Sequence, residues 1–339
     1  MLQSSCLANS IIDVDGLSVG NAQDRALASG VTAVLVERPN VASIVTSGGA
    51  PGQRDTALLE PGMTVEGVDA IVLSGGSAYG LDAAGGVMAA LRDRGVGLHV
   101  GSAVVPIVAQ AILFDLLNGG DKNWGREPPY WRLGLDAAMA ASRTVLALGT
   151  AGAGYGATTA TLKGGLGSAS ATTSSGVRVG AIAAVNAIGS AVVGDGPHFW
   201  AAPYERNGEL GGLGLPATIG ATDLRMRIKS GAPPATTIAL VATDAVLTKA
   251  EAKRLAIMAD DGLARAIRPA HAPMDGDTVF AVATQRRAVS GPAELTEIGL
   301  LAADCLARAI ARGVYEATAL PFAHALPAWR DRFAGKVAP

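Results

Sequence analysis

Short apolar runs rich in β-branched residues constrain the fold of this chain more than any other feature of its sequence. Such runs occur at residues 31–37, 42–46, 70–74, 177–185, 236–243 and 278–284. Their length, and the Gly, Pro or Asn residues that bound the first three, indicate β-strands. Strands that are apolar on both faces must be covered on both faces. The sequence therefore predicts an α+β fold in which sheets stack on each other and helices cover the outside.

Helical periodicity is found between these strands and after them. Residues 81–94 end at Gly95, residues 133–144 are rich in Ala, and residues 292–316 form a long apolar stripe. A further helix should begin after Thr248, because Thr248 and Glu251 have the spacing of a capping box, and should continue until Pro269. The charged link at residues 195–230, rich in Gly and Pro, is expected to be irregular.

The charge balance and the apolar stretches argue against nucleic acid and membrane partners. With 27 Lys and Arg against 29 Asp and Glu the net charge is −2, and no basic block is present, so we expect no nucleic acid partner. Apolar stretches at residues 95–114, 145–162 and 179–194 approach the length of a membrane span, but polar residues or glycines interrupt each one. We expect buried strands and tightly packed helices there, and no membrane partner. Residues 1–16 lack the basic start and long apolar segment of a secretory signal, so a cytoplasmic location is expected.

Cysteine and histidine usage argues against a structural disulfide or zinc framework. Two cysteines, Cys6 and Cys305, cannot form a disulfide framework, and Cys305 fits the apolar stripe of a late helix. The histidines, at positions 99, 198, 271 and 324, lie far apart and lack zinc-site spacing. We therefore predict no metal and no cofactor.

Two glycine-rich motifs do not match well-known catalytic or nucleotide-binding patterns. Residues 74–80 (SGGSAYG) lack the Gly two positions after Ser77 that a nucleophile elbow requires. Residues 152–157 (GAGYGA) lack the full dinucleotide-binding spacing, and the sequence contains no P-loop. These glycines are expected to let the backbone approach another backbone or a substrate closely.

Two other segments gain meaning only in combination. By pattern alone, residues 233–245 (PPATTIALVATDA) start a buried strand and residues 274–278 (MDGDT) form an acidic turn. They occur in order with SGGAPGQRDTALL (47–59), VDAIVLSGGSAYGLDAAGGVM (68–88), NWGREPP (123–129), LKGGLGSAS (162–170) and AAVN (183–186). Together these motifs closely resemble the S58 or P1 family of self-cleaving aminopeptidases, which includes L-aminopeptidase/D-esterases, β-aminopeptidases and nylon-oligomer hydrolases. The resemblance covers about residues 10–315.

This resemblance implies one domain over residues 1–339, a four-layer αββα sandwich of the N-terminal nucleophile hydrolase type. It also implies a precursor that cuts itself between Ala235 and Thr236, giving an α chain, residues 1–235, and a β chain, residues 236–339. The nucleophile then falls on Thr236, with Thr237 the less favoured neighbour. A Thr hydroxyl is a weak nucleophile that needs a base, and the amine freed by cleavage on the same residue can supply one.

The resemblance also implies roles for the remaining site residues. Lys163 would stabilise developing charge or hold the hydroxyl, and Asn186 would donate a hydrogen bond to the oxyanion. Asp275 and Asp277 match an acidic pair that would orient the amine and hydroxyl of Thr236. Since no series of further oxygen ligands follows the pair, we expect it to serve the nucleophile rather than a metal ion.

Two departures from the family pattern bear on processing and activity. Ala235 stands where close relatives carry Asn or Gly, and Phe114 stands where nylon-oligomer enzymes carry a Tyr in the catalytic site. The sequence leaves open how these departures affect self-cleavage, and whether the chain is cleaved at all.

The implied function is hydrolysis of amide bonds in small peptides, amides or amino-acid oligomers with a free amino end. The sequence does not decide between α-, β- and ω-amino acyl substrates. Two alternatives are an acyltransferase similar to ornithine acetyltransferases, which share the self-cleaving fold, and a binding scaffold that is never processed. The resemblance also implies a homo-oligomer, without fixing its number of subunits.

Overall fold

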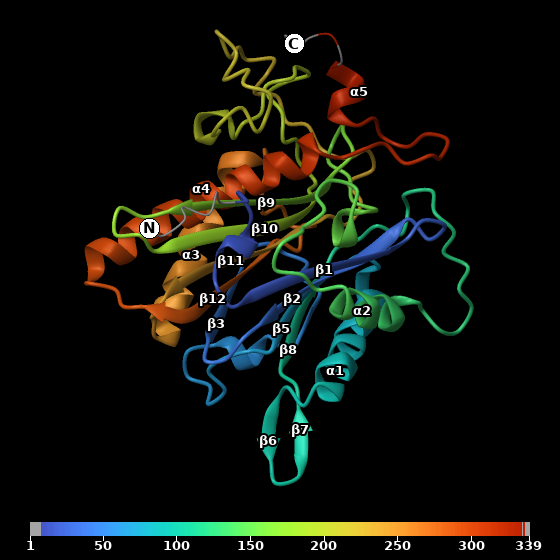
Figure 1. Ribbon diagram of the computed structural model, residues 1–339. Helices are drawn as coiled ribbons and strands as arrows, with labels where there is room; N and C mark the ends of the chain where they lie inside the picture. Colours follow the sequence, from blue (N-terminus) through green and yellow to red (C-terminus); the bar gives the residue numbers. More distant parts are fainter. Residues whose placement is uncertain (1–7, 334, 336–339) are drawn as a thin grey trace.

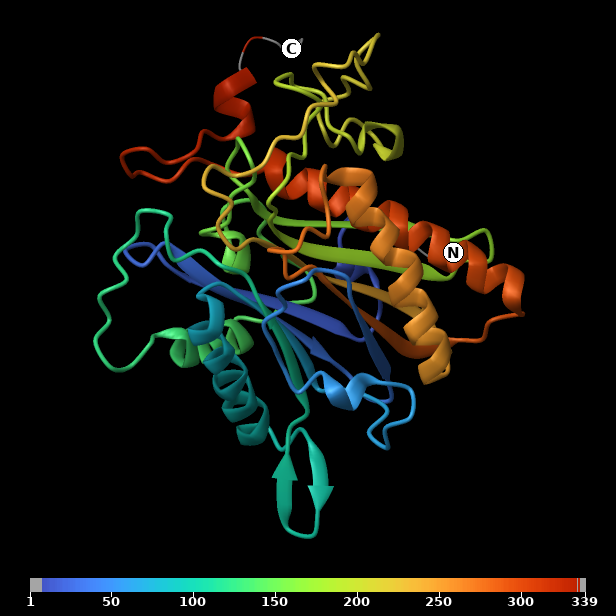
Figure 2. The ribbon, with the colours of Figure 1, turned by 180° about the vertical axis from the view of Figure 1, so that it is seen from behind.

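Two five-stranded sheets stack face to face, and helices cover their outer faces (Figures 1 and 2). The computed structural model describes residues 8–333 and 335. One cluster of buried apolar side chains lies between the two sheets. A second cluster lies between the first sheet and its helices, and a third lies between the second sheet and its helices. This arrangement is a four-layer αββα sandwich, so the predicted α+β fold class is confirmed.

The first sheet has the strand order β1-β2-β5-β8-β4. Its strands are β1 (Leu17–Asp24), β2 (Ser29–Val36), β5 (Ala70–Ser74), β8 (Val108–Ile112) and β4 (Gln53–Arg54). Strands β5 and β8 are parallel, and the other neighbours are antiparallel. A separate hairpin, β6 (Leu98–Val100) and β7 (Ala103–Val105), projects from the end of this half of the molecule (Figure 1).

The second sheet has the strand order β3-β12-β11-β10-β9. Its strands are β3 (Val41–Thr46), β12 (Thr278–Arg287), β11 (Thr236–Ala245), β10 (Arg178–Asn186) and β9 (Gly165–Thr172). Strands β11 and β12 are parallel, and the other neighbours are antiparallel. Strand β11 lies at the centre, and all 10 of its residues are buried.

Helices α1 (Ala83–Asp93) and α2 (Tyr130–Met139) pack on the first sheet, whereas α3 (Lys249–Ala266) and α4 (Pro292–Tyr315) pack on the second. A short helix, α5 (Trp329–Phe333), follows near the end of the described chain. Short 3-10 helices are formed by Ile11–Asp13, Ala57–Leu59, Ser77–Asp82, Gly152–Gly154 and Ala202–Tyr204.

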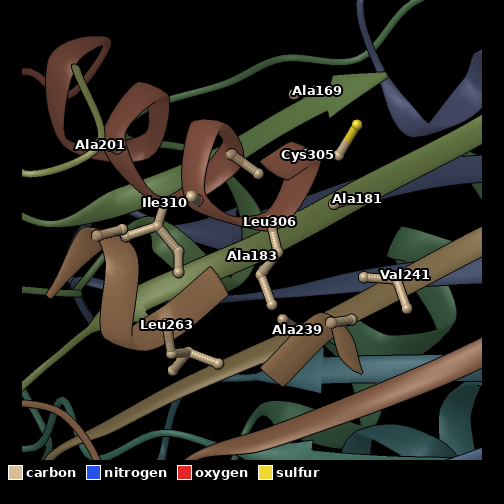
Figure 3. Packing of buried hydrophobic residues seen from close by; sticks show 14 of the residues in the cluster. Ala169, Ala181, Ala183, Ala201, Ala239, Val241, Leu263, Cys305, Leu306 and Ile310 are labelled. Carbon is tan, nitrogen blue, oxygen red and sulfur yellow. The ribbon is translucent and has the colours of Figure 1, made fainter. Parts of the chain in front are cut away.

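Small side chains let the helices approach the second sheet closely. Figure 3 shows Cys305, Leu306 and Ile310 of α4 above alanines of β9 and β10. At Gly167 of β9, an added Cβ would lie only 1.9 Å from the carbonyl oxygen of Ala309, so a larger residue would push α4 away. Cys305 is fully buried, as expected, whereas Cys6 lies outside the described residues.

Most of the predicted elements are present, with differences at their ends. The capping box at Thr248 is confirmed, because its hydroxyl accepts a hydrogen bond from the Glu251 backbone N–H. The helix predicted at residues 133–144 is present, but both predicted ends are wrong. The observed helix α2 begins at Tyr130, directly after Pro129, and ends at Met139. The helix expected from residue 81 begins as the 3-10 helix Ser77–Asp82 before α1.

Other differences concern segments with weak sequence patterns. Strands β1 and β9 were not predicted, because polar residues or glycines interrupt their apolar pattern. Strand β8 lies within residues 95–114, where buried strands or packed helices were expected, and all of its residues are buried. Residues 145–162, expected as buried strand or packed helix, are largely irregular and contain only the 3-10 helix Gly152–Gly154. Within residues 8–333 and 335, no helix is both long and apolar enough to cross a membrane.

Candidate active site

Sheet topology brings the predicted site residues to one end of the second sheet. Because β11 and β12 are parallel, Thr236 at the start of β11 lies beside the turn that precedes β12, where Ala235 and Asp275 form a bridge. Strand β10 runs the opposite way, so its last residue, Asn186, is the register partner of Thr236. Strand β9 is antiparallel to β10 and starts at the same end, two residues after Lys163.

The Thr236 hydroxyl contacts the carbonyl group of the peptide bond expected to be cut. Thr236 Oγ1 donates a hydrogen bond to the Ala235 carbonyl oxygen. The backbone N–H of Gly276 donates to that same carbonyl oxygen at 3.0 Å and to Thr236 Oγ1 at 3.2 Å. An added Cβ at Gly276 would lie 2.8 Å from Thr236 Oγ1 and 2.8 Å from the Ala50 carbonyl oxygen. Only glycine therefore fits this position without displacing the hydroxyl.

Thr237 has a different environment from Thr236. Its side chain points to the opposite face of β11, because side chains alternate along a strand. Among the described residues, the buried Thr237 hydroxyl has no hydrogen-bond partner. Its backbone N–H donates to Asp277 Oδ1 at 2.8 Å.

The two predicted carboxylates flank Gly276 and accept mainly backbone hydrogen bonds. Asp275 accepts from the N–H groups of Ile188, at 3.3 Å, and Ala272, at 3.1 Å. Asp277 Oδ2 accepts from the His271 backbone N–H at 3.0 Å and lies 3.0 Å from His271 Nδ1. In the intact chain the carboxylates thus hold the loop around Gly276, and the hydroxyl of Thr236 bonds to that loop's backbone.

Lys163 and Asn186 are both almost fully buried. Lys163 Nζ donates to the carbonyl oxygens of Gly154, at 3.0 Å, and Gly164, at 2.7 Å. Asn186 Nδ2 donates to the Phe114 carbonyl oxygen at 2.8 Å. Phe114, noted above as a departure from a Tyr, therefore lies next to the predicted oxyanion residue and contributes its backbone oxygen.

A cavity of about 380 Å³ adjoins these residues. Its wall includes Lys163 and Asn186, together with Pro233 and Pro234 from the segment before Thr236. Apolar side chains form another part of the wall, among them Phe114, Leu117, Leu320 and Leu326. Thr236 itself is only 4% exposed in the intact chain. The segment that precedes the predicted cut is thus part of the cavity wall.

Burial shifts the pKa values of several groups at this end of the sheet. Desolvation lowers the pKa of Lys163 to about 7, although Asp115 opposes this shift. Desolvation and the neighbouring charge of Asp277 raise the pKa of Asp275 to about 6. A hydrogen bond to Asp277 raises the pKa of His271 above its ordinary value. Groups that titrate near neutral pH are typical of catalytic sites.

Three groups near the site were not predicted from the sequence as site residues. Lys229 Nζ donates to the backbone and side-chain oxygens of Asn186, both at 2.9 Å. Asp115 is buried and accepts from Ser29 Oγ at 2.7 Å and the Gly76 N–H at 2.8 Å. The third is the Gly276 N–H. Lys229 lies in the irregular link and Asp115 follows strand β8 as a single acidic residue, so neither carried a recognisable spacing signal.

Comparisons with known proteins identify the family of this chain. The model of "Peptidase family S58" matches residues 9–325. An uncharacterized aminopeptidase of Mycobacterium tuberculosis is 46% identical over 349 residues, covering 96% of this chain and 98% of the relative. A 6-aminohexanoate-oligomer endohydrolase of a Kocuria species is 27% identical over 288 residues, covering 80% of this chain and 74% of the relative.

A solved structure shares the fold. The L-aminopeptidase D-Ala-esterase/amidase of Ochrobactrum anthropi, which has a variant of the Ntn hydrolase fold, superposes with a TM-score of 0.69 at 20% sequence identity. The match covers 97% of this chain and 95% of the other. The chain therefore belongs to peptidase family S58, whose members are hydrolases of amide bonds, and it has the Ntn hydrolase fold.

Proposed function

We propose that this chain is an aminopeptidase or amidase that processes itself between Ala235 and Thr236 and then uses Thr236 as its N-terminal nucleophile. One observation carries the proposal: the Thr236 hydroxyl bonds to the Ala235 carbonyl oxygen, and the Gly276 N–H donates to both oxygens. A backbone donor on the carbonyl oxygen is what an attacked carbonyl needs, because negative charge develops on that atom.

Self-cleavage would proceed through an ester. Thr236 Oγ1 bonds to the Ala235 carbonyl carbon, the C–N bond between the two residues breaks, and the hydroxyl proton passes to the leaving nitrogen. Water then hydrolyses the ester, which releases the carboxylate of Ala235 and restores the hydroxyl. The products are the chains 1–235 and 236–339, with a free amine on Thr236.

In the mature enzyme, the freed amine would act as the base for its own hydroxyl. Asn186, opposite Thr236 in the β10–β11 ladder, would donate to the oxyanion of the substrate. Buried Lys163 would stabilise developing charge. Asp275 and Asp277 would orient the amine once it is no longer part of a peptide bond, and a nearby carboxylate favours the charged form of an amine.

Cleavage would also open the route from the cavity to the nucleophile. Pro233 and Pro234 form part of the cavity wall in the intact chain, and Thr236 is almost fully buried. After cleavage, residues 233–235 end in a free carboxylate and can move away from the new amine. Substrate hydrolysis is therefore expected only after self-cleavage.

The substrate class we propose is a small peptide, amide or amino-acid oligomer with a free amino end. The printed names of the relatives, aminopeptidase and 6-aminohexanoate-oligomer endohydrolase, support this class. We also propose that the enzyme works in the cytoplasm as a homo-oligomer; a charged-residue content of only 17% supports assembly.

The proposal is tested by intact mass and activity of matched threonine variants. The wild type should separate under denaturing conditions into fragments of 235 and 104 residues, from chains 1–235 and 236–339, and should hydrolyse aminoacyl anilides, β-alanyl peptides or aminohexanoate oligomers. Thr236→Ala should remain whole and inactive, because both reactions need the same hydroxyl.

Thr237→Val is the control, because it keeps the side-chain shape but removes a neighbouring hydroxyl that has no hydrogen-bond partner within residues 8–333 and 335. This variant should mature and retain activity. Processing of Thr236→Ala, or a folded Thr237→Val that stays whole, would contradict the assignment. A folded wild type that stays whole and inactive would instead favour an unprocessed binding scaffold.

A further inference from the structure

Lys229 is a buried lysine whose contacts converge on the predicted oxyanion residue. Its Nζ donates to the backbone oxygen and to Oδ1 of Asn186, both at 2.9 Å. It also lines the cavity, where its ammonium group lies near the charged groups of Asp115, Asp275 and Lys163. The sequence placed Lys229 in an irregular link, six residues before Ala235.

The contacts of Asn186 explain what this lysine does. An ammonium group has hydrogen-bond donors only, so the amide atom facing it must be the oxygen. Oδ1 of Asn186 also accepts from the Thr158 backbone N–H at 3.0 Å. Because its oxygen is held from two sides, the Asn186 amide directs Nδ2 toward Phe114. The Phe114 carbonyl oxygen accepts a hydrogen bond from one of the two N–H groups of Nδ2, at 2.8 Å. Phe114 and Asn186 both line the cavity.

We propose that Lys229 is a positioning residue, whose ammonium group fixes the Asn186 amide with its N–H donors toward the oxyanion of the substrate. This inference rests on the proposed function, because it assumes that Asn186 is the oxyanion donor. It assigns Lys229 a role through Asn186 rather than direct contact with the reacting atoms.

The backbone of Lys229 allows this role to persist after cleavage. Its N–H donates to the Ile188 carbonyl oxygen at 3.0 Å, and its own carbonyl oxygen accepts from the Ala232 N–H at 3.0 Å. Lys229 is therefore anchored to the segment that follows β10, and residues 233–235 can move without releasing it.

The environment of Lys229 makes its contacts with Asn186 difficult to replace. Desolvation lowers its pKa to about 7, although Asp275 and Asp115 act in the opposite direction. A buried lysine without such acceptors would be strongly unfavourable. A methionine at this position would keep most of the side-chain volume but would leave Asn186 Oδ1 with the Thr158 donor alone.

The experiment is a double-mutant cycle on the processed enzyme. Asn186→Ala should lower kcat by roughly 10² to 10³-fold, and Lys229→Met should lower kcat by roughly 10 to 10²-fold with little change in KM. The double variant should have nearly the same kcat as Asn186→Ala alone, because Lys229 acts through Asn186. Lys229→Arg should recover part of the loss, because a guanidinium can still donate to Oδ1.

Lys249→Met is the matched control for loss of a buried lysine. Lys249 Nζ donates to the carbonyl oxygens of Leu58, Met63 and Val65, at the start of α3 and away from the cavity. This variant should lose stability but keep kcat. If Lys229→Met does not mature, the cycle is run on mature Lys229→Arg, whose remaining loss of kcat should likewise disappear in the Asn186→Ala background.

The outcomes separate the inference from the proposed function. Additive losses in the double variant, or a mature Lys229→Met with unchanged kcat, would overturn the role of Lys229 while leaving Thr236 as nucleophile. Activity in Thr236→Ala would overturn the proposed function itself, whatever Lys229→Met shows.

Discussion

Two buried charged clusters of this molecule are organised in opposite ways. Under α4, Arg308 and Glu209 form a two-pronged ion pair, with Nε–Oε1 at 2.5 Å and a second contact at 3.0 Å. At the candidate active site, Lys163 donates to backbone carbonyl oxygens and Asp275 accepts from backbone N–H groups. In the first cluster the carboxylate is paired with a guanidinium, whereas Lys163 and Asp275 in the second are held by neutral backbone groups.

This difference separates a structural cluster from the candidate catalytic one. Burial would raise the pKa of Glu209, but hydrogen bonds and charge from Arg308 lower it below its ordinary value. At the site, burial dominates and moves the pKa values of Lys163 and Asp275 toward neutrality. Groups that are not neutralised by a direct partner can interact with charge that develops on a substrate.

The largest effect is expected from Gly276→Ala, which tests whether backbone geometry at the site is essential. The added Cβ would lie 2.8 Å from Thr236 Oγ1, so the hydroxyl and the N–H donor cannot keep their present positions. Self-cleavage should be abolished or slowed at least 10²-fold, as for the loss of one oxyanion donor. Denaturing electrophoresis over time measures the rate of self-cleavage.

Gly62→Ala provides the control for Gly276→Ala, because an added Cβ at Gly62 meets no atom of the described part of the chain within 4 Å. This variant should mature at the wild-type rate. Normal processing of Gly276→Ala would remove the Gly276 N–H from the mechanism.

The next effect, on stability, should come from Arg308→Met in the ion-paired cluster. Removing one partner leaves the buried Glu209 carboxylate without its main counter-charge, which destabilises by about 3–5 kcal/mol. Thermal or denaturant unfolding measures the loss. The kcat per folded molecule should stay unchanged, and a large fall in kcat would contradict the structural role of this cluster.

The smallest effect is expected from Asp275→Asn, and it depends on pH. The folded pKa of about 6 lies above the ordinary 3.8, so the folded state binds the proton more tightly than the unfolded chain. The stability contributed by this group is present below pH 3.8 and is lost as the pH rises to about 6. Asp275→Asn should lack this decline in stability with rising pH. It should also turn over several-fold more slowly and show an altered pH–rate profile near pH 6.

Asp304→Asn is the comparison for Asp275→Asn. Asp304 is partly buried and pairs with Arg265 on the helical side of the second sheet, 2.7 Å away. Its replacement should leave the pH–rate profile unchanged. A wild-type profile for Asp275→Asn would indicate that the Asp275 carboxyl does not take part in turnover.

The sequence predicted the layers of the fold better than the details of the site. Buried strands such as β11 are continuous apolar runs, so pattern alone identifies them, and the capping box places the start of α3. Strand β9 was missed because GLGSASAT consists mostly of small residues, of which Gly165 and Gly167 let α4 approach closely. Its small side chains give no periodic signal.

The site residues were predicted from the resemblance to family S58, and sheet topology explains why they lie close together in space. The pattern could not reveal the Gly276 N–H, because every residue other than Pro has such a group and only the fold aims it. Nor could it reveal Lys229, because a single lysine in a polar link is ordinary until the fold buries it against Asn186. The experiments described above test the proposed roles of Thr236, Asn186 and Asp275 directly.

The interleaving of strands in the second sheet has a consequence for the reversibility of folding. Strands β11 and β12 follow the proposed cut, whereas their neighbours β10 and β3 precede it, so each fragment would supply alternate parts of one sheet. The ten residues of β11 are all buried, and the fragments share one core. Their separation would therefore require global unfolding rather than simple dissociation on dilution. The intact chain folds as a single molecule, but the cut enzyme could refold only by a bimolecular encounter of its fragments, so its assembled state would be protected mainly by a slow rate of unfolding.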